Sequence, residues 1–541
     1  MGVVPGVVRR AGGNAARAVR LLAARAVLGR RAPFWLLARL VPPFEETRTA
    51  RLPFARERSS RLLETLRALD AAARDPRVGG VLVRCAGAPH GYAAAASLRR
   101  ALDAVRAAGK PVAAYGETMH QAEYWVASGA DRLWLPETGS IHLVGLRSES
   151  MFFARLLARL DLKPDVVRVG SHKAAAETFT RESMSPESRE QIEAYLDDVF
   201  GELVAAIAAG RRLDVATVRA RIDAGPYRSE AACEAGLADG CRYPDQVEEA
   251  LVELLPATGE VPPSGGAPRA RLVDADAYAA LHADDAGWSP FWRERPRIAY
   301  VSARGVIHRR GGVAGISVEA LSRTLRALGE DDGVRAIVLR IESPGGDALA
   351  SDVLWRALSV AKRDKPLVVS MGEVAASGGY FAAVAGDAIF AEPATLTGSI
   401  GVVGGKLDAG ALLEKWGVDH EAIERGSRAG LLTSLRGFTP DERSLVRRDM
   451  ESVYDVFLRR VEAGRKLTRA DVTRMAQGRV WSGVRALALG LVDAHGGPLE
   501  AIHEARSRAG LADDEAVALD VQPRHAPADL LRGLLGVEAS L

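Results

Sequence analysis

Residues 364–400 read DKPLVVSMGEVAASGGYFAAVAGDAIFAEPATLTGSI, and residues 109–141 read GKPVAAYGETMHQAEYWVASGADRLWLPETGSI. Both stretches carry the same features in the same order: Lys-Pro, an apolar strand, a turn, a helix, another strand and Thr-Gly-Ser-Ile. Gly372 follows Gly116 by 256 residues, and Tyr380 follows Tyr124 by the same number. A chain that repeats one order of elements in this way is predicted to fold as two copies of one unit.

The similarity extends to both sides of these stretches. Upstream, RVGGVLVRCAGAPHG (77–91) matches GVRAIVLRIESPGGD (333–347), and downstream DLKPDVVRVGSHKAAAE (161–177) matches KWGVDHEAIERGSRAGL (415–431). We therefore predict a first repeat at 56–255 and a second at 296–510, joined by a Pro/Gly-rich linker at 256–295. A basic segment at 1–55 and a tail at 511–541 flank them.

Each repeat alternates short Val/Ile/Leu-rich runs with longer stretches of helical period. AIVLRI (336–341) precedes the helical pattern SDVLWRALSVAKRD (351–364), for example. This alternation predicts an α/β fold of mostly parallel strands covered by helices. Functional sites of such sheets lie at the carboxyl ends of strands, which is where Ser377 and the SPGGD loop (343–347) are predicted to lie.

Composition excludes several classes of protein. The chain has 541 residues, 48% apolar and 26% charged, as expected of a globular protein with several domains. A net charge of +3 gives no signature of nucleic-acid binding. The three cysteines are not spaced as CxxC and the ten histidines form no HExxH motif, so we expect no disulfide framework and no zinc site.

The N-terminal 44 residues carry eight arginines and no acidic residue. Arginines interrupt every apolar run, so neither a spanning helix of about 20 residues nor a cleavable signal peptide is predicted. Such a segment can lie on an anionic lipid surface, which is a possible peripheral membrane contact. A basic leader without a membrane role is the alternative.

The two repeats differ where chemistry is expected. Ser377 of the second repeat aligns with Gln121 of the first, and Lys173 of the first aligns with Ala429 of the second. A serine becomes a nucleophile when a base removes its proton, and a lysine acts as that base when burial lowers its pKa. The alternatives are a small-residue turn around Ser377 and a solvated lysine at a helix start.

Backbone amides at glycines are candidate donors to an oxyanion. Gly378 is predicted at a helix N-terminus, and Gly345 and Gly346 lack a Cβ that would keep a carbonyl group away. The alternative is that Pro-Gly-Gly forms a turn at the end of a strand. Ser359 and Lys362 also form an S-x-x-K pattern, but it lies in the middle of a predicted helix without its usual partner motifs.

Five stretches together resemble the long, duplicated form of signal peptide peptidase A, a family of serine proteases. They are SPGGDALASD (343–352), MGEVAASGGYF (371–381), PATLTGSIGVVGG (393–405), GRVWSGVRALALGLVDAHGG (478–497) and VGSHKAAAETFTRESMSPESR (169–189). The resemblance runs from about residue 60 to 510. It implies two tandem repeats of the crotonase or caseinolytic-protease fold.

The resemblance also implies a setting and a mechanism that needs no metal or organic cofactor. Ser377 would be the nucleophile, Lys173 the general base, Ser399 a partner of the lysine, and Gly378 with the Gly345–Gly346 loop the oxyanion donors. The substrates would be peptides left from cleaved signal peptides, the assembly a homotetramer and the location the inner membrane, with a cytoplasmic location as the alternative. Glu373 stands where the family more often has a small or apolar residue, and we expect it at the rim of the substrate pocket.

Two other functions remain open from sequence. The same fold serves acyl-CoA hydratases and isomerases, which hold a thioester oxyanion with glycine amides and need neither Ser377 nor Lys173. A catalytically inactive, membrane-associated scaffold is the third class, and it predicts loss of the serine or the lysine. The residues at the site, not the fold, distinguish these functions.

Overall fold

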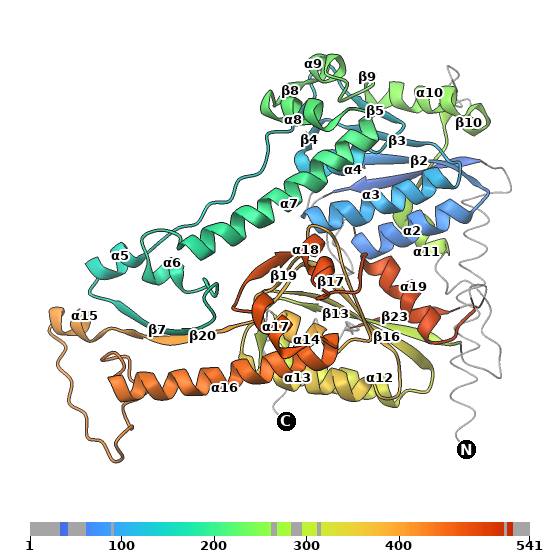
Figure 1. Cartoon of the computed structure of the whole chain (residues 1–541). Helices are drawn as coiled ribbons and strands as arrows, with labels where there is room; N and C mark the ends of the chain where they lie inside the picture. Colours follow the sequence, from blue (N-terminus) through green and yellow to red (C-terminus); the bar gives the residue numbers. More distant parts are fainter. Residues whose placement is uncertain are drawn as a thin grey trace.

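The structure of the chain is a computed structural model that describes residues 33–41, 61–87, 91–260, 268–282, 295–310, 315–512, 515 and 517–522. The first repeat, blue to green in Figure 1, lies above the second, which is yellow to red. An arm formed by both repeats extends to the left of the two bodies in that view.

The first repeat is built on a sheet of six parallel strands. In spatial order these are β12 (Leu272–Asp274), β1 (Phe34–Leu40), β2 (Val78–Cys85), β3 (Val112–Gly116), β5 (Arg132–Leu135) and β9 (Gly240–Cys241). A small second sheet contains β4 (Thr118–His120), β6 (Ser140–His142) and β8 (Tyr227–Arg228).

The second repeat has a corresponding sheet of eight strands. They are β23 (Ala518–Gln522), β13 (Arg297–Arg304), β16 (Val334–Ser343), β17 (Leu367–Ala376), β18 (Ala388–Ala391), β22 (Ala494–His495), β19 (Leu396–Gly398) and β21 (Val480–Ser482). Only β19 and β21 pair antiparallel in this sheet, as β6 and β8 do in the first repeat. The predicted duplication and α/β class are therefore confirmed strand by strand.

Amphipathic helices cover both sheets because their apolar residues recur on one face. The first repeat contains α2 (Leu62–Arg74), α3 (Tyr92–Ala107), α4 (Gln121–Ala127), α7 (Pro186–Arg211), α8 (Val215–Asp223), α9 (Ser229–Glu234), α10 (Pro244–Leu254) and α11 (Ala275–His282). The second contains α12 (Val318–Glu330), α13 (Ala348–Ala361), α14 (Gly378–Ala383), α16 (Pro440–Arg465), α17 (Arg469–Met475), α18 (Gly483–Ala488) and α19 (Pro498–Arg508). Each repeat buries an extensive apolar core of its own between its sheet and its helices.

The described residues also include several short elements outside the two main sheets. They are β10 (Gly259–Glu260) with β11 (Arg269–Ala270), β14 (Ile307–His308) with β15 (Ile316–Ser317), and the 3-10 turn η1 (Pro256–Thr258).

The arm is formed by matching elements of the two repeats. Helices α7 and α16 have 26 residues each, begin with a hydroxyl N-cap followed by proline, and are about 39 Å long at 1.5 Å per residue. They lead to α5 (Ala154–Arg159), α6 (Glu177–Thr180), β7 (Lys163–Val169), β20 (Val402–Asp408) and α15 (Gly410–Lys415). Strands β7 and β20 pair antiparallel along their full lengths, from Val169 opposite Val402 to Lys163 opposite Asp408. One repeat therefore completes a sheet with the other.

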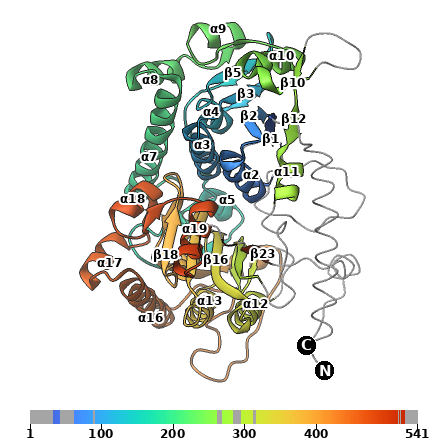
Figure 2. The same cartoon turned by 90° about the vertical axis from the view of Figure 1, so that its right-hand side faces the viewer.

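The repeats also meet between their bodies, where α3 packs on β17 and α7 packs on β21. Figure 2 shows α7 running from the first repeat down to α18 of the second. Arg100 on α3 forms ion pairs with Glu392 and Glu500 of the second repeat. Glu392 is only 1% exposed and also accepts a hydrogen bond from Ser97, so this interface contains a buried, paired charge.

Three predicted boundaries differ from the structure. β1 was placed in the basic segment 1–55, β12 in the linker 256–295 and β23 in the tail 511–541, but each belongs to the sheet of a repeat. The edge strands β12 and β23 are only three and five residues long, too short for a period to be recognised. The arginine-rich residues 1–32 and 42–55, and the linker residues 261–267 and 283–294, lie outside the described residues.

Candidate active site

Ser377 lies at a sharp turn between β17 and α14, with φ 54° and ψ −119°. A non-glycine residue in this region of backbone space is strained, and such strain is concentrated at functional sites. Its backbone is held from both sides, because its amide donates to the Gly398 carbonyl at 2.8 Å and its carbonyl accepts from Phe381. The serine is therefore presented on a rigid strand–turn–helix.

The small residues around Ser377 are required by close packing. A Cβ on Gly378 would lie 2.3 Å from Ser351 Oγ, and one on Gly379 would lie 2.8 Å from the Ser343 carbonyl oxygen. A Cβ on Gly345 would lie 2.8 Å from Ser377 Cβ. The SPGG loop thus packs directly against the serine turn, which explains why the sequence has no bulky side chains there.

Lys173 lies in the loop after β7, and its amine is directed at the serine. Nζ is 3.0 Å from Ser377 Oγ and 2.9 Å from Ser399 Oγ, and it donates to the Ser399 carbonyl oxygen at 2.8 Å. The side chain is 5% exposed, and burial lowers the pKa of Lys173 to about 8. A buried amine without a carboxylate partner in its hydrogen-bond shell favours the neutral form, which is the form that acts as a base.

Contacts with the second repeat fix the loop that carries Lys173. The β7–β20 ladder ends at Val169, and the amide of His172 then donates to the Gln477 carbonyl at 2.8 Å. A Cβ on Gly478 would lie 2.6 Å from both the Cβ and the amide nitrogen of Lys173, so only glycine fits under the lysine. The lysine of one repeat is thereby placed by the backbone of the other.

The amides of Gly345, Gly346 and Gly378 differ in whether they already donate a hydrogen bond. Gly345 donates its amide to Ser343 Oγ at 3.1 Å, and its carbonyl accepts from Ile307. The amides of Gly346 and Gly378 donate to no other group in the part of the chain that the structure describes. The two residues lie side by side, because a Cβ on Gly378 would be 3.3 Å from the Gly346 nitrogen. Gly346 and Gly378 are therefore the available pair of donors, and Gly345 supports the loop.

Among the described residues of the first repeat, the position aligned with Ser377 forms no comparable centre. Gln121, which aligns with Ser377, donates to the Tyr92 hydroxyl and accepts from the amides of Val144 and Gly145. The Ser359–Lys362 pattern is also inert, since Ser359 donates to the Trp355 carbonyl and Lys362 pairs with Asp387.

Two kinds of feature are not found among the described residues. No helix there is long and apolar enough to span a membrane. No group of three or more His, Cys, Asp or Glu side chains is arranged to hold a metal ion.

Sequence reasoning gave no role to Ser343 and a different role to Glu373. Ser343 holds Gly345, and its only sequence signal is its place at the start of the SPGG loop. Glu373 was expected at the pocket rim, but its carboxylate accepts hydrogen bonds from the amides of Ala93 and Ala94 in the first repeat. A charge within the small and apolar run PLVVSMGEVAAS was the available signal.

A serine at a strained turn, a buried amine within bonding distance and two free amides define a serine hydrolase site. Comparison with known proteins agrees. The sequence profile described as peptidase family S49 matches residues 104–257 and again 359–512. The chain belongs to peptidase family S49 and is a serine peptidase.

Three relatives illustrate the match. "Serine protease SPPA, chloroplastic" of Arabidopsis thaliana is 32% identical over 87% of this chain and 70% of the relative. "Protease 4" of Salmonella typhi is 31% identical over 78% of this chain and 69% of the relative. "Putative signal peptide peptidase SppA" of Enterococcus faecium is 30% identical over 40% of this chain and 65% of the relative. The match decides among the three functions left open by sequence in favour of the peptidase.

Proposed function

We propose that this chain hydrolyses peptides, including cleaved signal peptides, with Ser377 as nucleophile and Lys173 as general base. The observation that carries the proposal is the 3.0 Å contact between Lys173 Nζ and Ser377 Oγ, formed across the two repeats. The names of the relatives support the substrate class.

The reaction follows from the geometry. Neutral Lys173 removes the proton of Ser377 as Oγ attacks the peptide carbonyl carbon, and the carbonyl oxygen takes up the negative charge. The amides of Gly346 and Gly378 hold this oxyanion, while Ser399 keeps the amine aligned. Protonated Lys173 then gives its proton to the leaving amine. Water, deprotonated by the same amine, releases the acyl group from Ser377.

The test is peptide hydrolysis combined with fluorophosphonate labelling. Ser377→Ala and Lys173→Arg are expected to lose activity by about three or more orders of magnitude, because nucleophile and base act as one unit. Ser399→Ala is expected to lose about tenfold, since the lysine keeps the Ser399 carbonyl as a partner. Ser359→Ala and Lys362→Arg are the matched controls and keep wild-type activity. Labelling at a serine other than Ser377, or full turnover by Lys173→Arg, contradicts the proposal.

We further propose that the protein is a homotetramer. Large apolar side chains on and near the arm are exposed to solvent: Met151, Leu156, Phe179, Trp416, Ile423 and Leu432. Trp416 is 76% exposed and Ile423 83%, and a group of such residues is typical of an interface. Light scattering is expected to give about four times 57.6 kDa for the wild type. A smaller particle is expected for Trp416→Arg/Ile423→Arg, and a wild-type monomer contradicts the proposal.

We propose membrane association through the basic N-terminal segment, of which residues 1–32 and 42–55 lie outside the described residues. Its arginines suit an anionic lipid headgroup. Flotation with vesicles that contain anionic lipid, and not with neutral vesicles, is the expected result. A protein that floats with neither supports the cytoplasmic location instead.

A further inference from the structure

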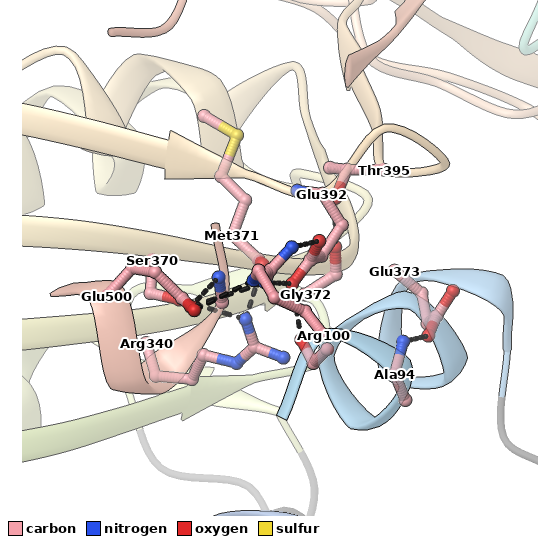
Figure 3. A network of polar contacts seen from close by, with 12 residues as sticks. Ala94, Arg100, Arg340, Ser370, Met371, Gly372, Glu373, Glu392, Thr395 and Glu500 are labelled. Carbon is pink, nitrogen blue, oxygen red and sulfur yellow. Dashed lines mark hydrogen bonds and ion pairs between the residues drawn. The ribbon is translucent and has the colours of Figure 1, made fainter. Parts of the chain in front are cut away.

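The N-terminus of α3 in the first repeat is capped by a carboxylate from the second repeat. Glu373 accepts hydrogen bonds from the amides of Ala93 at 3.0 Å and Ala94 at 2.8 Å. Figure 3 shows its side chain directed from β17 at the start of this helix. The first amides of a helix lack partners within the helix, and a carboxylate satisfies them with the favourable sign of the helix dipole.

The equivalent helix of the second repeat is capped in the ordinary way. Asp347 precedes α13, and its carboxylate accepts from the Ala350 amide at 2.8 Å. The residue aligned with Asp347 is Gly91, which offers no side-chain cap to α3. A Cβ on Gly91 would lie 2.1 Å from the carboxylate carbon of Glu373. Glycine at position 91, in place of an acid, therefore leaves space for the Glu373 carboxylate. It also leaves the first amides of α3 without a side-chain cap from their own repeat.

The aligned acid of the first repeat behaves differently. Glu117 follows Gly116 as Glu373 follows Gly372, but its side chain is 66% exposed and forms an ion pair with Arg84 at 3.6 Å. The same residue type at the same place in the fold thus has two environments. The cap formed by Glu373 is a property of the contact between repeats and not of the strand itself.

Glu373 is four residues before Ser377 on β17, the strand whose end sets the position of the nucleophile. Lys173 is held separately, through the β7–β20 ladder and the Gln477 contact. The distance between Ser377 and Lys173 therefore depends on where β17 lies and on where the loop after β7 is held. We propose that Glu373 is a positioning residue of the Ser377–Lys173 site, which ties the strand leading to Ser377 to α3 of the first repeat. This inference rests on the proposed roles of Ser377 and Lys173.

The surroundings of the carboxylate make its charge sensitive to pH. Glu373 keeps some exposure to solvent, but protein surrounds its carboxylate. Burial raises the pKa of Glu373 to about 7; Glu342 acts in the same direction, and the two amides and Arg340 act against it. Tyr92 of α3 and Tyr195 of α7 also face it, and both remain neutral in this range because burial raises their pKa. Above pH 7 the ionised carboxylate holds both amides.

The test compares Glu373→Gln and Glu373→Ala with Glu117→Gln. Glutamine keeps the volume of the side chain but offers one acceptor oxygen and places an NH₂ group against an amide. We expect kcat to fall about 10- to 100-fold in both Glu373 variants with KM changed less than about twofold, because a displacement of about 1 Å at a nucleophile has this effect. Fluorophosphonate labelling of Ser377 is expected to slow by a similar factor. Glu117→Gln leaves both rates at the wild-type value.

A pH profile separates positioning from general support of the fold. Below pH 7 protonation of Lys173 and protonation of Glu373 both lower the rate, so log kcat of the wild type is expected to rise with a slope greater than one over the one to two pH units in which the loss from Glu373 develops. The slope in Glu373→Gln is expected to fall to one, and the slope in Glu117→Gln to match the wild type. A wild-type kcat and an unchanged slope in Glu373→Gln overturn the inference, as does an equal loss in Glu117→Gln.

A double-mutant cycle with Gly91→Ala and Glu373→Gln tests the inference even if Glu373→Ala does not fold. Gly91→Ala is expected to displace the Glu373 carboxylate and to lower kcat as much as Glu373→Gln does. In the double variant, Gly91→Ala should lower kcat by less than about a further twofold, because both changes remove the same contact between Glu373 and α3. Fully additive losses overturn the inference. If Ser377→Ala retains activity, the proposed function fails first; if Ser377→Ala is inactive and Glu373→Gln is normal, only the positioning role fails.

Discussion

Lys173 Nζ and Ser377 Oγ are 3.0 Å apart although 204 residues of chain separate them. Each belongs to a different copy of one fold, and the aligned positions in the other copy are Gln121 and Ala429. The contact between them, and with it the proposed catalytic pair, therefore forms only when the two repeats are docked. The following predictions test the consequences of that arrangement.

Activity is expected to rise with pH. The amine must be neutral to accept the serine proton, and burial lowers the pKa of Lys173 to about 8. The rate constant kcat/KM should therefore increase through a midpoint near pH 8 and level off above it. A profile that falls between pH 7 and 9, measured with a peptide that does not titrate in this range, contradicts the role of Lys173.

Lys173→Met is expected to stabilise the fold at pH 7 while it abolishes activity. The unfolded lysine keeps its proton up to about its usual pKa of 10.5, whereas the folded one loses it near 8, so protonation opposes folding below pH 8. The 2.5-unit difference sets an upper limit of about 3 kcal/mol for the gain in free energy of unfolding.

The gain from Lys173→Met has a defined pH dependence. The wild type becomes more stable as pH rises from 8 towards 10.5, so the advantage of methionine should shrink over that range. Denaturant unfolding at pH 7, 9 and 10 measures it. An advantage that stays constant with pH would show that packing, not charge, is responsible.

Gly346→Ala is expected to lose most of its activity. A Cβ at Gly346 would lie 2.1 Å from the Ile307 carbonyl oxygen, so the loop must move and its amide leaves the serine. We expect kcat to fall about 100-fold or more, as when an oxyanion donor is lost. Gly329→Ala on α12 is the control, because nothing lies within 4 Å of the added Cβ, and it should stabilise the fold by about 0.5 kcal/mol. Equal activity of the two variants contradicts the role of Gly346.

Arg100→Ala is expected to weaken the docking of the repeats. It leaves Glu392, 1% exposed, without its cationic partner, which costs about 3 kcal/mol in free energy of unfolding for a buried charge. Glu392→Gln in the same variant should recover part of this loss by removing the charge. Arg147→Ala removes an ion pair between two side chains that are 79% and 73% exposed, and should not change the unfolding temperature. Identical unfolding curves for both arginine variants would contradict this account.

The duplicated α/β architecture could be predicted from the amino-acid sequence alone, because periods of apolar residues and glycine turns depend on local physics that each copy repeats. The sequence also indicated the serine, the lysine and the glycine loop, because comparison of the copies exposed what each had kept or lost. It did not recognise the edge strands β12 and β23, since short strands carry little pattern, nor β1, an interior strand of seven residues that lies in the arginine-rich N-terminal segment.

How these residues contact one another could be seen only in the folded chain. The 3.0 Å approach of Lys173 to Ser377, the engagement of the Gly345 amide by Ser343 and the capping of α3 by Glu373 all depend on contacts between distant segments. Local sequence cannot specify such contacts, because the burial that lowers the pKa of Lys173 and raises that of Glu373 arises only when one repeat packs on the other.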